Sequence, residues 1–337
     1  MPLLWFKNYL SERKQCVNVN NNLSSYRDIT CGVPQGSILG PILFLIYIND
    51  IIHSTNAFDF RLFADDTNLF QFINDKSDII QLDLFNFDFR KVCDWCDANM
   101  LTINADKTNF MIIKTSQRSV KTEGSLSINH SQIRRVASIN YLGVSLDQHM
   151  LWNSHIEKVI NSISPIIGII SKIRHYMPKS ILLLIYNSMI LPHLSYCIEI
   201  WGNTYKSFLQ PILNLQKKVL RLITFSDFRA PSAPLFRQLS ILNVHQLCIF
   251  NTCLFIFDLK NNNFSQTVHD YLDPIPHNYV TRLSTGDKFY IPKVNLTLSQ
   301  HSFKYTATKH WNSLPDQLKK IGTRSTFKSK LKQYLLV

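Results

Sequence analysis

The stretch Phe60-Arg-Leu-Phe-Ala-Asp-Asp-Thr-Asn-Leu-Phe70 decides how this chain can fold, because it places two adjacent carboxylates between two apolar runs. Apolar and polar side chains alternate before the pair, and apolar residues resume after it. Alternation of period two on either side of a short polar break predicts a strand, a tight turn and a second strand. Asp65 and Asp66 are therefore expected at the turn of a β-hairpin.

The adjacent carboxylates indicate a metal site. Two neighbouring carboxylates repel each other, and a bound divalent cation removes that repulsion. Mg²⁺ prefers hard oxygen ligands and takes one or two carboxylates together with substrate phosphates. The alternative is an ordinary polar hairpin turn, because aspartate is common in turns. The hairpin alone leaves both interpretations open.

The charge of the chain is unevenly distributed. The sequence has 337 residues, of which 45% are hydrophobic and 12% aromatic, as expected for a folded protein. Its formal net charge is +13, but residues 1–149 carry 14 Lys and Arg against 15 Asp and Glu, whereas residues 150–337 carry 22 against 8. A basic second half predicts a polyanionic partner. A basic solvated surface without a partner, or attraction to an anionic membrane surface, is the alternative.

The cysteines favour a reducing compartment. There are seven, an odd number, and no segment has the charged start, apolar run and cleavage site of a signal peptide. We therefore expect an intracellular protein of the nucleus or cytoplasm that is not secreted. Cys93 and Cys96 form a single C-x-x-C without a second ligand pair at zinc spacing, which predicts two buried helix cysteines and not a metal site.

A glycine-rich loop and an apolar helix precede the hairpin. Gly32, Pro34 and Gly36 predict a loop of fixed shape whose backbone can approach another molecule closely. Residues 39–48 are almost all apolar, which predicts a buried helix that is too short to span a bilayer. The loop and the helix N-terminus offer donors to a phosphate or a base. A structural loop beside a core helix is the alternative.

The chain after the hairpin predicts one more mixed segment and then helices. Residues 78–100 have the pattern of an amphipathic helix, and residues 139–146 read as a strand with an internal glycine. Lys107 lies in a turn from which it could reach a phosphate, although an exposed turn lysine is the simpler interpretation. Helices are predicted over residues 153–175, 180–201, 208–224 and 244–259.

Together these stretches resemble the reverse transcriptases of non-LTR (LINE-like) retrotransposons, closest to the jockey-like group. Residues 32–50 resemble motif B, Phe63 to Asp66 match motif C, Asn99 to Thr108 resemble motif D, and Tyr141-Leu142-Gly143 resemble motif E. Residues 198–203, 215–223, 311–315 and 327–335 resemble the C-terminal region of these elements. An Ala-Asp-Asp triplet alone would be a weak signal, but motifs B to E in order are specific.

The resemblance implies an α+β fold. It predicts a partial polymerase palm over residues 1–149, with an antiparallel sheet and helices. A mostly helical thumb-like region follows over residues 150–260, and a basic C-terminal region over residues 261–337.

The resemblance also implies the chemistry of an RNA-directed DNA polymerase. Two Mg²⁺ ions would support nucleotidyl transfer, with an RNA template, a DNA primer and deoxynucleoside triphosphates as partners, and with no membrane and no obligate protein partner. Asp65 would be a direct metal ligand and Asp66 a supporting carboxylate. The other implied site residues are Pro34, Gln35 and Gly36 where template and incoming nucleotide pair, Lys107 near the triphosphate, and Tyr141, Leu142 and Gly143 as the primer grip.

The chain departs from the family at motif A. In the family this motif precedes the segment that contains Trp5 and carries another metal-binding aspartate, and this chain does not contain it. Asp50 and Asp59 are poor substitutes, because they lie at a helix end and on the strand that enters the turn. We therefore expect the isolated chain to be an N-terminally truncated fragment with little or no activity. A non-catalytic nucleic-acid-binding remnant is the alternative, and the C-terminal resemblance argues against a group II intron maturase.

Overall fold

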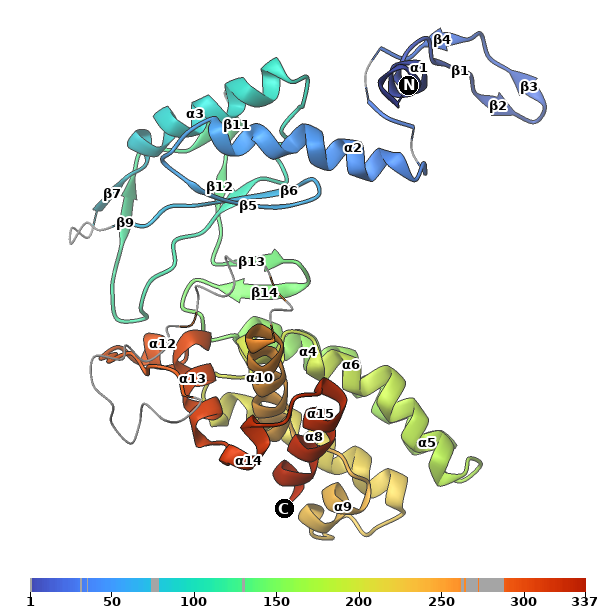
Figure 1. Cartoon of the computed structure of the whole chain (residues 1–337), viewed down its shortest axis with the longest axis vertical. Coiled ribbons are helices and arrows are strands. Elements are labelled where there is room, and N and C mark those ends of the chain that lie inside the picture. The colour runs from blue at the N-terminus through green and yellow to red at the C-terminus, as the bar shows by residue number, and fades with distance from the viewer. Residues whose placement is uncertain are drawn as a thin grey trace. The chain divides into compact units, whose positions relative to one another are not determined.

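A computed structural model of the chain describes residues 2–30, 32–34, 36–73, 79–128, 131–261, 264, 272 and 288–337. The chain forms two compact units, Met1–Phe110 with Ser119–Arg134, and Met111–Arg118 with Arg135–Val337 (Figure 1). Helices occur together with short, mainly antiparallel sheets, which confirms the predicted α+β class. Within the described residues, no helix combines the length and the apolar character needed to cross a membrane.

The first unit contains short helices and two-stranded sheets. α1 (Pro2–Leu10), α2 (Leu39–Ile48), the 3₁₀ helix η1 (Asn49–His53) and α3 (Leu82–Ala98) are its helices. The antiparallel pairs are β1 (Lys14–Gln15) with β4 (Arg27–Asp28), β2 (Asn18–Val19) with β3 (Asn22–Leu23), β5 (Asp59–Phe63) with β6 (Asp66–Phe70), and β10 (Ser127–Ile128) with β11 (Ser131–Gln132). β7 (Ile79–Gln81) pairs in parallel with β9 (Lys121–Glu123), and β8 (Asn109–Phe110) lies beside β12 (Arg134–Arg135).

The core of the first unit is small. Phe60, Leu62 and Leu69 of the β5–β6 hairpin pack against a cluster that contains the buried Ile51 of η1 and Val92 of α3. Figure 1 shows the hairpin beside α2 and α3. Cys93 and Cys96 are both buried on α3, as predicted. Burial raises the pKa of the Cys93 thiol to about 11, so this thiol stays protonated and inert at neutral pH.

Two expectations for the first unit are wrong. The bounds of α2 are as predicted, but the helix is not buried. Ile42 is 51% exposed and Ile46 is 69% exposed, because α2 reaches the hydrophobic cluster mainly through Phe44 and Ile48. Residues 79–81, predicted as the start of a helix, form β7 instead. The apolar pair at 79–80 fits either structure, and the pairing with β9 selects the strand.

The second unit is mostly helical. It begins with the β13 (Ser138–Tyr141) and β14 (Val144–Asp147) hairpin. The helices that follow are α4 (Asn153–Ile173), α5 (Lys179–Ile185), the π-helix η2 (Tyr186–Ile190), α6 (Leu191–Ser195), α7 (Ile198–Trp201), α8 (Lys206–Thr224), α9 (Ser232–Gln238) and α10 (Val244–Lys260). Residues 288–337 contain α12 (Thr297–Gln300), α13 (Phe303–Ser313), α14 (Asp316–Lys319) and α15 (Arg324–Leu336).

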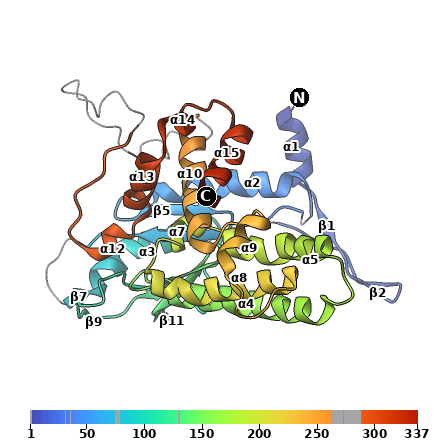
Figure 2. The same cartoon turned by 90° about the horizontal axis from the view of Figure 1, so that it is seen from below.

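One continuous core holds this unit together. α4 and α8 pack side by side (Figure 2), and Trp201, Trp311 and Phe327 are completely buried. The buried Gln216 donates to the Tyr186 hydroxyl (3.1 Å) and to a backbone carbonyl, and accepts from Val244 N (2.8 Å). A buried amide with all of these partners stabilises one arrangement of α8 against α10.

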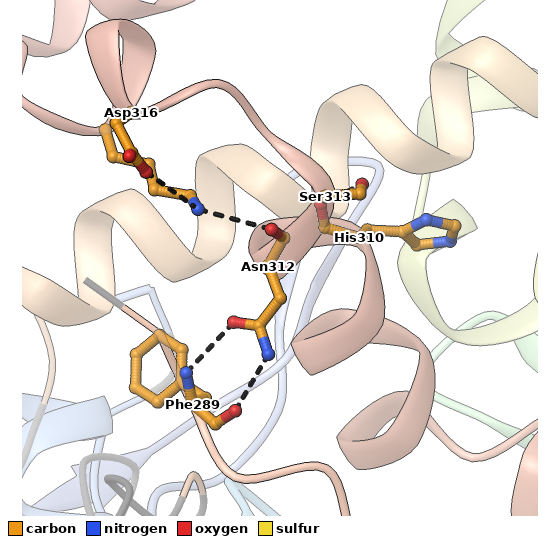
Figure 3. Close-up of polar contacts among 6 residues, drawn as sticks. Phe289, His310, Asn312, Ser313 and Asp316 are labelled. Atoms are coloured by element: carbon orange, nitrogen blue, oxygen red, sulfur yellow. Dashed lines mark hydrogen bonds and ion pairs between the residues drawn. The ribbon is translucent and has the colours of Figure 1, made fainter. Parts of the chain in front are cut away.

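Asparagine and lysine side chains fix the C-terminal helices. Asn312 accepts a hydrogen bond from Phe289 N (3.0 Å) and donates one to Phe289 O (2.8 Å), so its amide pairs with the backbone as a neighbouring strand would (Figure 3). Lys319 donates to the Asn312 carbonyl and lies 3.7 Å from Asp316. Arg324 Nε also donates to both oxygens of Asp258. The C-terminal helices therefore belong to the same core.

Two further expectations need correction here. Residues 139–146 are not one strand, because β13 and β14 pair around a turn at Leu142 and Gly143. The candidate helix over residues 180–201, for whose apolar run a buried helix pair is the preferred interpretation, is divided into α5, η2, α6 and α7. Its direction changes at Cys197, whose φ of 51° is incompatible with a continuous right-handed helix.

Candidate functional site

The predicted hairpin is present, and it places the two aspartates at its turn. Phe63 pairs with Asp66, which leaves Ala64 and Asp65 as a two-residue loop between β5 and β6. Ala64 has a φ of 51°, which matches the left-handed backbone that such tight hairpins require. Apolar contacts hold the other end of the hairpin, so the turn is rigidly supported. Asp65 and Asp66 are both exposed there.

The donors at this turn fit a hard divalent cation only in part. Asp65 and Asp66 supply two neighbouring carboxylates, and Mg²⁺ accepts such ligands with substrate phosphates completing its shell. However, the residues that the structure describes contain no group of three or more His, Cys, Asp or Glu side chains that could hold a metal. The pair therefore suits one ion shared with a substrate, and it does not suit a complete two-metal site.

The loop before α2 has the fixed shape that its sequence predicts. Gly36 has a φ of 76°, and an added Cβ would meet no atom within 4 Å, so its backbone is accessible. Ser37 Oγ donates to Pro34 O (2.8 Å) and accepts from Gly40 N (3.0 Å), which ties the loop to the first turn of α2. This places Pro34 and Gly36 on one loop. Gln35 lies outside the described residues.

Lys107 lies in the predicted turn and is exposed. Its backbone N–H donates to the Asn104 carbonyl (3.3 Å), and the Thr108 hydroxyl donates to the same carbonyl (2.8 Å). The turn is therefore fixed while the lysine side chain extends into solvent. This geometry permits contact with a phosphate and equally fits an exposed turn lysine, so the role of Lys107 stays a prediction.

The turn predicted as the primer grip is held firmly within the second unit. Leu142 and Gly143 both have positive φ values, 45° and 86°, at the two-residue turn that follows Tyr141. The Tyr196 hydroxyl donates to Leu142 O (2.6 Å), and Lys158 Nζ donates to Gly143 O (3.0 Å). The turn thus has a defined position on the helices of this unit.

The residues that hold this turn are distant from it in sequence or carry only a local signal. Tyr196 follows it by more than fifty residues, and nothing in the local pattern links the two. Asp147 carries a clearer signal, because aspartate side chains often accept hydrogen bonds from the backbone N–H groups that follow them in a turn. Its carboxylate accepts from Leu151 N (3.1 Å) and Trp152 N (2.5 Å) at the start of α4. The hairpin and the helix are therefore joined through Asp147.

His155, in the first turn of α4, completes this junction. Its Nδ1 accepts a hydrogen bond from Ser145 N (3.3 Å), so the imidazole is neutral at that nitrogen. Burial, and secondly the nearby Lys158, lower the pKa of His155 to about 4. The ring also contacts Trp201, with the ring centres 5.2 Å apart. The side chain is thus a neutral structural histidine of the second unit.

The chain is similar to known polymerases of mobile elements. Residues 1–146 match the model of the family described as reverse transcriptase (RNA-dependent DNA polymerase). The chain is 27% identical to the "Probable RNA-directed DNA polymerase from transposon X-element" of Drosophila melanogaster, over 79% of this chain and 28% of that protein. It is also 27% identical to the RNA-directed DNA polymerase from the mobile element jockey of the same organism, over 70% of this chain and 26% of that protein.

A more distant relative points the same way. The chain is 24% identical to a Pol polyprotein from the type-1 retrotransposable element R1 of Nasonia vitripennis, over 52% of this chain and 44% of that protein. The chain spans little more than a quarter of the length of the X-element and jockey polymerases. Residues 1–146 therefore match the reverse transcriptase family model, and the chain is similar to the RNA-directed DNA polymerases of non-LTR retrotransposons, as its motifs predict.

Proposed function

We propose that this chain is the palm and thumb part of an RNA-directed DNA polymerase of a non-LTR retrotransposon. The observation that carries the proposal is the tight hairpin turn at which Asp65 and Asp66 are both exposed, within the segment matched to the reverse transcriptase family. The proposed partners are an RNA template, a DNA primer and deoxynucleoside triphosphates. The proposed location is intracellular, in the nucleus or cytoplasm.

Each predicted site residue has a role in this proposal. Asp65 binds Mg²⁺ directly and Asp66 supports it. When bound there, Mg²⁺ would supply positive charge to the phosphates of the incoming nucleotide. The Pro34–Gly36 loop, with Gln35, lines the position of the nascent base pair, and Lys107 contacts the triphosphate. The turn at Tyr141, Leu142 and Gly143 supports the primer, positioned by Tyr196 and Lys158.

The proposed division follows the palm at residues 1–149, the thumb at 150–260 and a basic C-terminal region at 261–337. The excess of basic residues after residue 149 supports binding of the nucleic-acid backbone by the second half. Because the described residues offer no third metal-binding carboxylate beside the pair, we expect the isolated chain to extend primers weakly at most.

The test compares two aspartates of the same hairpin. Asp65→Asn removes a proposed ligand, whereas Asp59→Asn removes an exposed carboxylate that pairs with Arg61 on the entering strand. Primer extension on a primed RNA template with Mg²⁺, at whatever level it occurs, should vanish in Asp65→Asn and persist in Asp59→Asn. Mn²⁺ binding, measured by water proton relaxation, should weaken only in Asp65→Asn. Equal behaviour of the two variants would contradict the assignment.

A non-catalytic nucleic-acid-binding remnant is the second candidate. It is favoured by the two-carboxylate limit at the hairpin together with the basic second half. Its signature is salt-sensitive binding of the primed template without extension in any variant. Mn²⁺ binding that does not depend on Asp65 would select this candidate over the first.

A further inference from the structure

A basic cavity lies in the second unit where α4 and α8 end. Its volume is about 530 Å³, within the range of small-ligand sites. We call it the Arg174 pocket; it is lined chiefly by Arg174, Lys218, Arg221, Phe225, Asp227 and Phe228. Three cations thus face one carboxylate, which gives the cavity a positive charge suited to an anion. No residue of the polymerase motifs contributes to it.

Cations near helix C-termini are often explained by the helix dipole. That explanation covers the positive charges of the Arg174 pocket but not its aromatic residues. Phe228 is 80% exposed, and Phe225 is 48% exposed, although large aromatic side chains are normally covered in a folded unit. The Arg174 guanidinium lies 5.1 Å from the centre of the Phe225 ring. Cation and ring are therefore already arranged as a paired surface.

Phe225 occupies a backbone position that normally selects glycine. It follows the last residue of α8 with a φ of 55°, and Ser226 N donates to Arg221 O (3.1 Å), which closes the helix end. Glycine is the usual residue at such a left-handed helix end, because a bulky side chain is strained there. A strained, exposed residue beside a charged cavity is a sign of function.

Arg174, which lines the pocket, also has an unsatisfied donor. Arg174 Nε is buried and has no hydrogen-bond partner among the described residues. A buried N–H without an acceptor is unfavourable, and the charge of the guanidinium makes an anionic oxygen its best acceptor. Lys218 supplies a second cation on the facing helix, α8. A phosphate group fits this pair of donors.

The loop that carries Phe228 is preformed. Arg221 donates from Nε (3.0 Å) and Nη2 (2.9 Å) to Ala230 O, which ties the loop back onto α8. The Asp227 carboxylate accepts from Arg229 N (2.8 Å) and so serves the turn itself. Phe228 is therefore held at the rim of the Arg174 pocket before any ligand arrives, and no folding of the loop is needed for binding.

From this arrangement we propose that the Arg174 pocket binds one nucleotide of single-stranded nucleic acid. The phosphate contacts Arg174 and Lys218, and the unpaired base lies against the exposed rings of Phe225 and Phe228. A base within a duplex has no free face for such stacking, so the site selects single strands. The proposal rests on the nucleic-acid role proposed above for the second half of the chain and adds a defined site to it.

The test measures binding of a labelled RNA hexanucleotide and of a short duplex by the full chain. Phe228→Leu keeps apolar volume but removes the ring, and it should weaken hexanucleotide binding by about 5- to 150-fold. Arg174→Gln should lower the salt slope of binding by about 0.7, the value for one phosphate of a single strand. Lys172→Gln removes an exposed charge from the same helix outside the pocket and should change neither quantity.

Phe225→Gly separates binding from folding. Glycine relieves the left-handed strain at this position, so the melting temperature should stay within a few degrees of the wild type, while hexanucleotide binding falls as in Phe228→Leu. Unchanged hexanucleotide affinity in both variants, or an equal loss for hexanucleotide and duplex, would overturn the proposal. So would Phe228-dependent binding to phosphatidylserine vesicles without an effect on the hexanucleotide. Asp65→Asn should leave hexanucleotide binding intact, which separates this test from that of polymerase function.

Discussion

The two units of this chain bury their apolar residues in very different ways. In the second unit Trp201, Trp311 and Phe327 are completely buried in one continuous core. In the first unit the buried residues form small clusters, and α1 and α2 expose large apolar side chains such as Trp5 and Ile46. The hairpin that carries Asp65 and Asp66 therefore belongs to the unit with the smaller hydrophobic core. We expect most of the folding free energy to come from the second unit.

Two tryptophans test this difference most strongly. Trp311→Ala removes a fully buried ring that lies 5.9 Å from the ring of Phe327, and it should lower the free energy of unfolding by about 3–5 kcal/mol. Trp5→Ala removes a tryptophan that is 54% exposed on α1 and should change it by about 0.5 kcal/mol or less. Urea unfolding followed by circular dichroism measures both. Similar losses of unfolding free energy in the two variants would contradict the inference that the second unit supplies most of the folding free energy.

Acid should weaken the second unit through His155. Its pKa is about 4 in the folded state, against 6.5 for the unfolded group, so the unfolded chain binds more protons between these values. Stability is therefore complete above pH 6.5 and is lost as the pH falls toward 4. The urea midpoint of His155→Gln should depend less on pH over this interval than that of the wild type. The exposed His193→Gln serves as a control, and an unaltered pH dependence in His155→Gln would contradict this account.

The smallest effect is expected on α2. The double variant Ile42→Gln and Ile46→Gln replaces two exposed apolar side chains, so the melting temperature should change by less than about 2 °C. Binding of a hydrophobic dye should decrease, because an exposed apolar patch is removed. A marked fall in melting temperature would instead show that this face of α2 is covered in solution. The two units would then differ less in how completely they bury their apolar side chains.

The sequence predicted the local structure of the site better than its surroundings. The hairpin at residues 60–70 follows from alternation around the aspartate pair, and the bounds of α2 follow from one apolar run. The exposure of α2 could not be read from that run, because an apolar sequence does not say which elements cover it. The contacts of α2 depend on elements distant in sequence. In the first unit, Phe44 and Ile48 connect α2 to the hydrophobic cluster.

Other features of the second unit were not predicted from the sequence, for related reasons. The β13–β14 hairpin was predicted as a single strand because residues 139–146 are mostly apolar, although the φ of 45° at Leu142 makes this residue part of a turn. Tyr196, directly after α6, and Lys158, on α4, hold that turn, and their approach to it is set by tertiary packing. The strain at Phe225 was equally invisible, since left-handed geometry is expected of glycine and not of phenylalanine.

The double hydrogen bond of Asn312 limits which residues this position can tolerate. Aspartate has almost the same size and shape, but it would set a second oxygen against the Phe289 carbonyl where Asn312 now donates. Glutamine has both groups but places them one methylene farther out. Replacing the amide nitrogen of Asn312 by an oxygen is thus disruptive here, although it leaves the size and shape of the side chain almost unchanged. Substitution at this site is governed by the direction of hydrogen-bond donation, and sequence similarity is a poor guide to it.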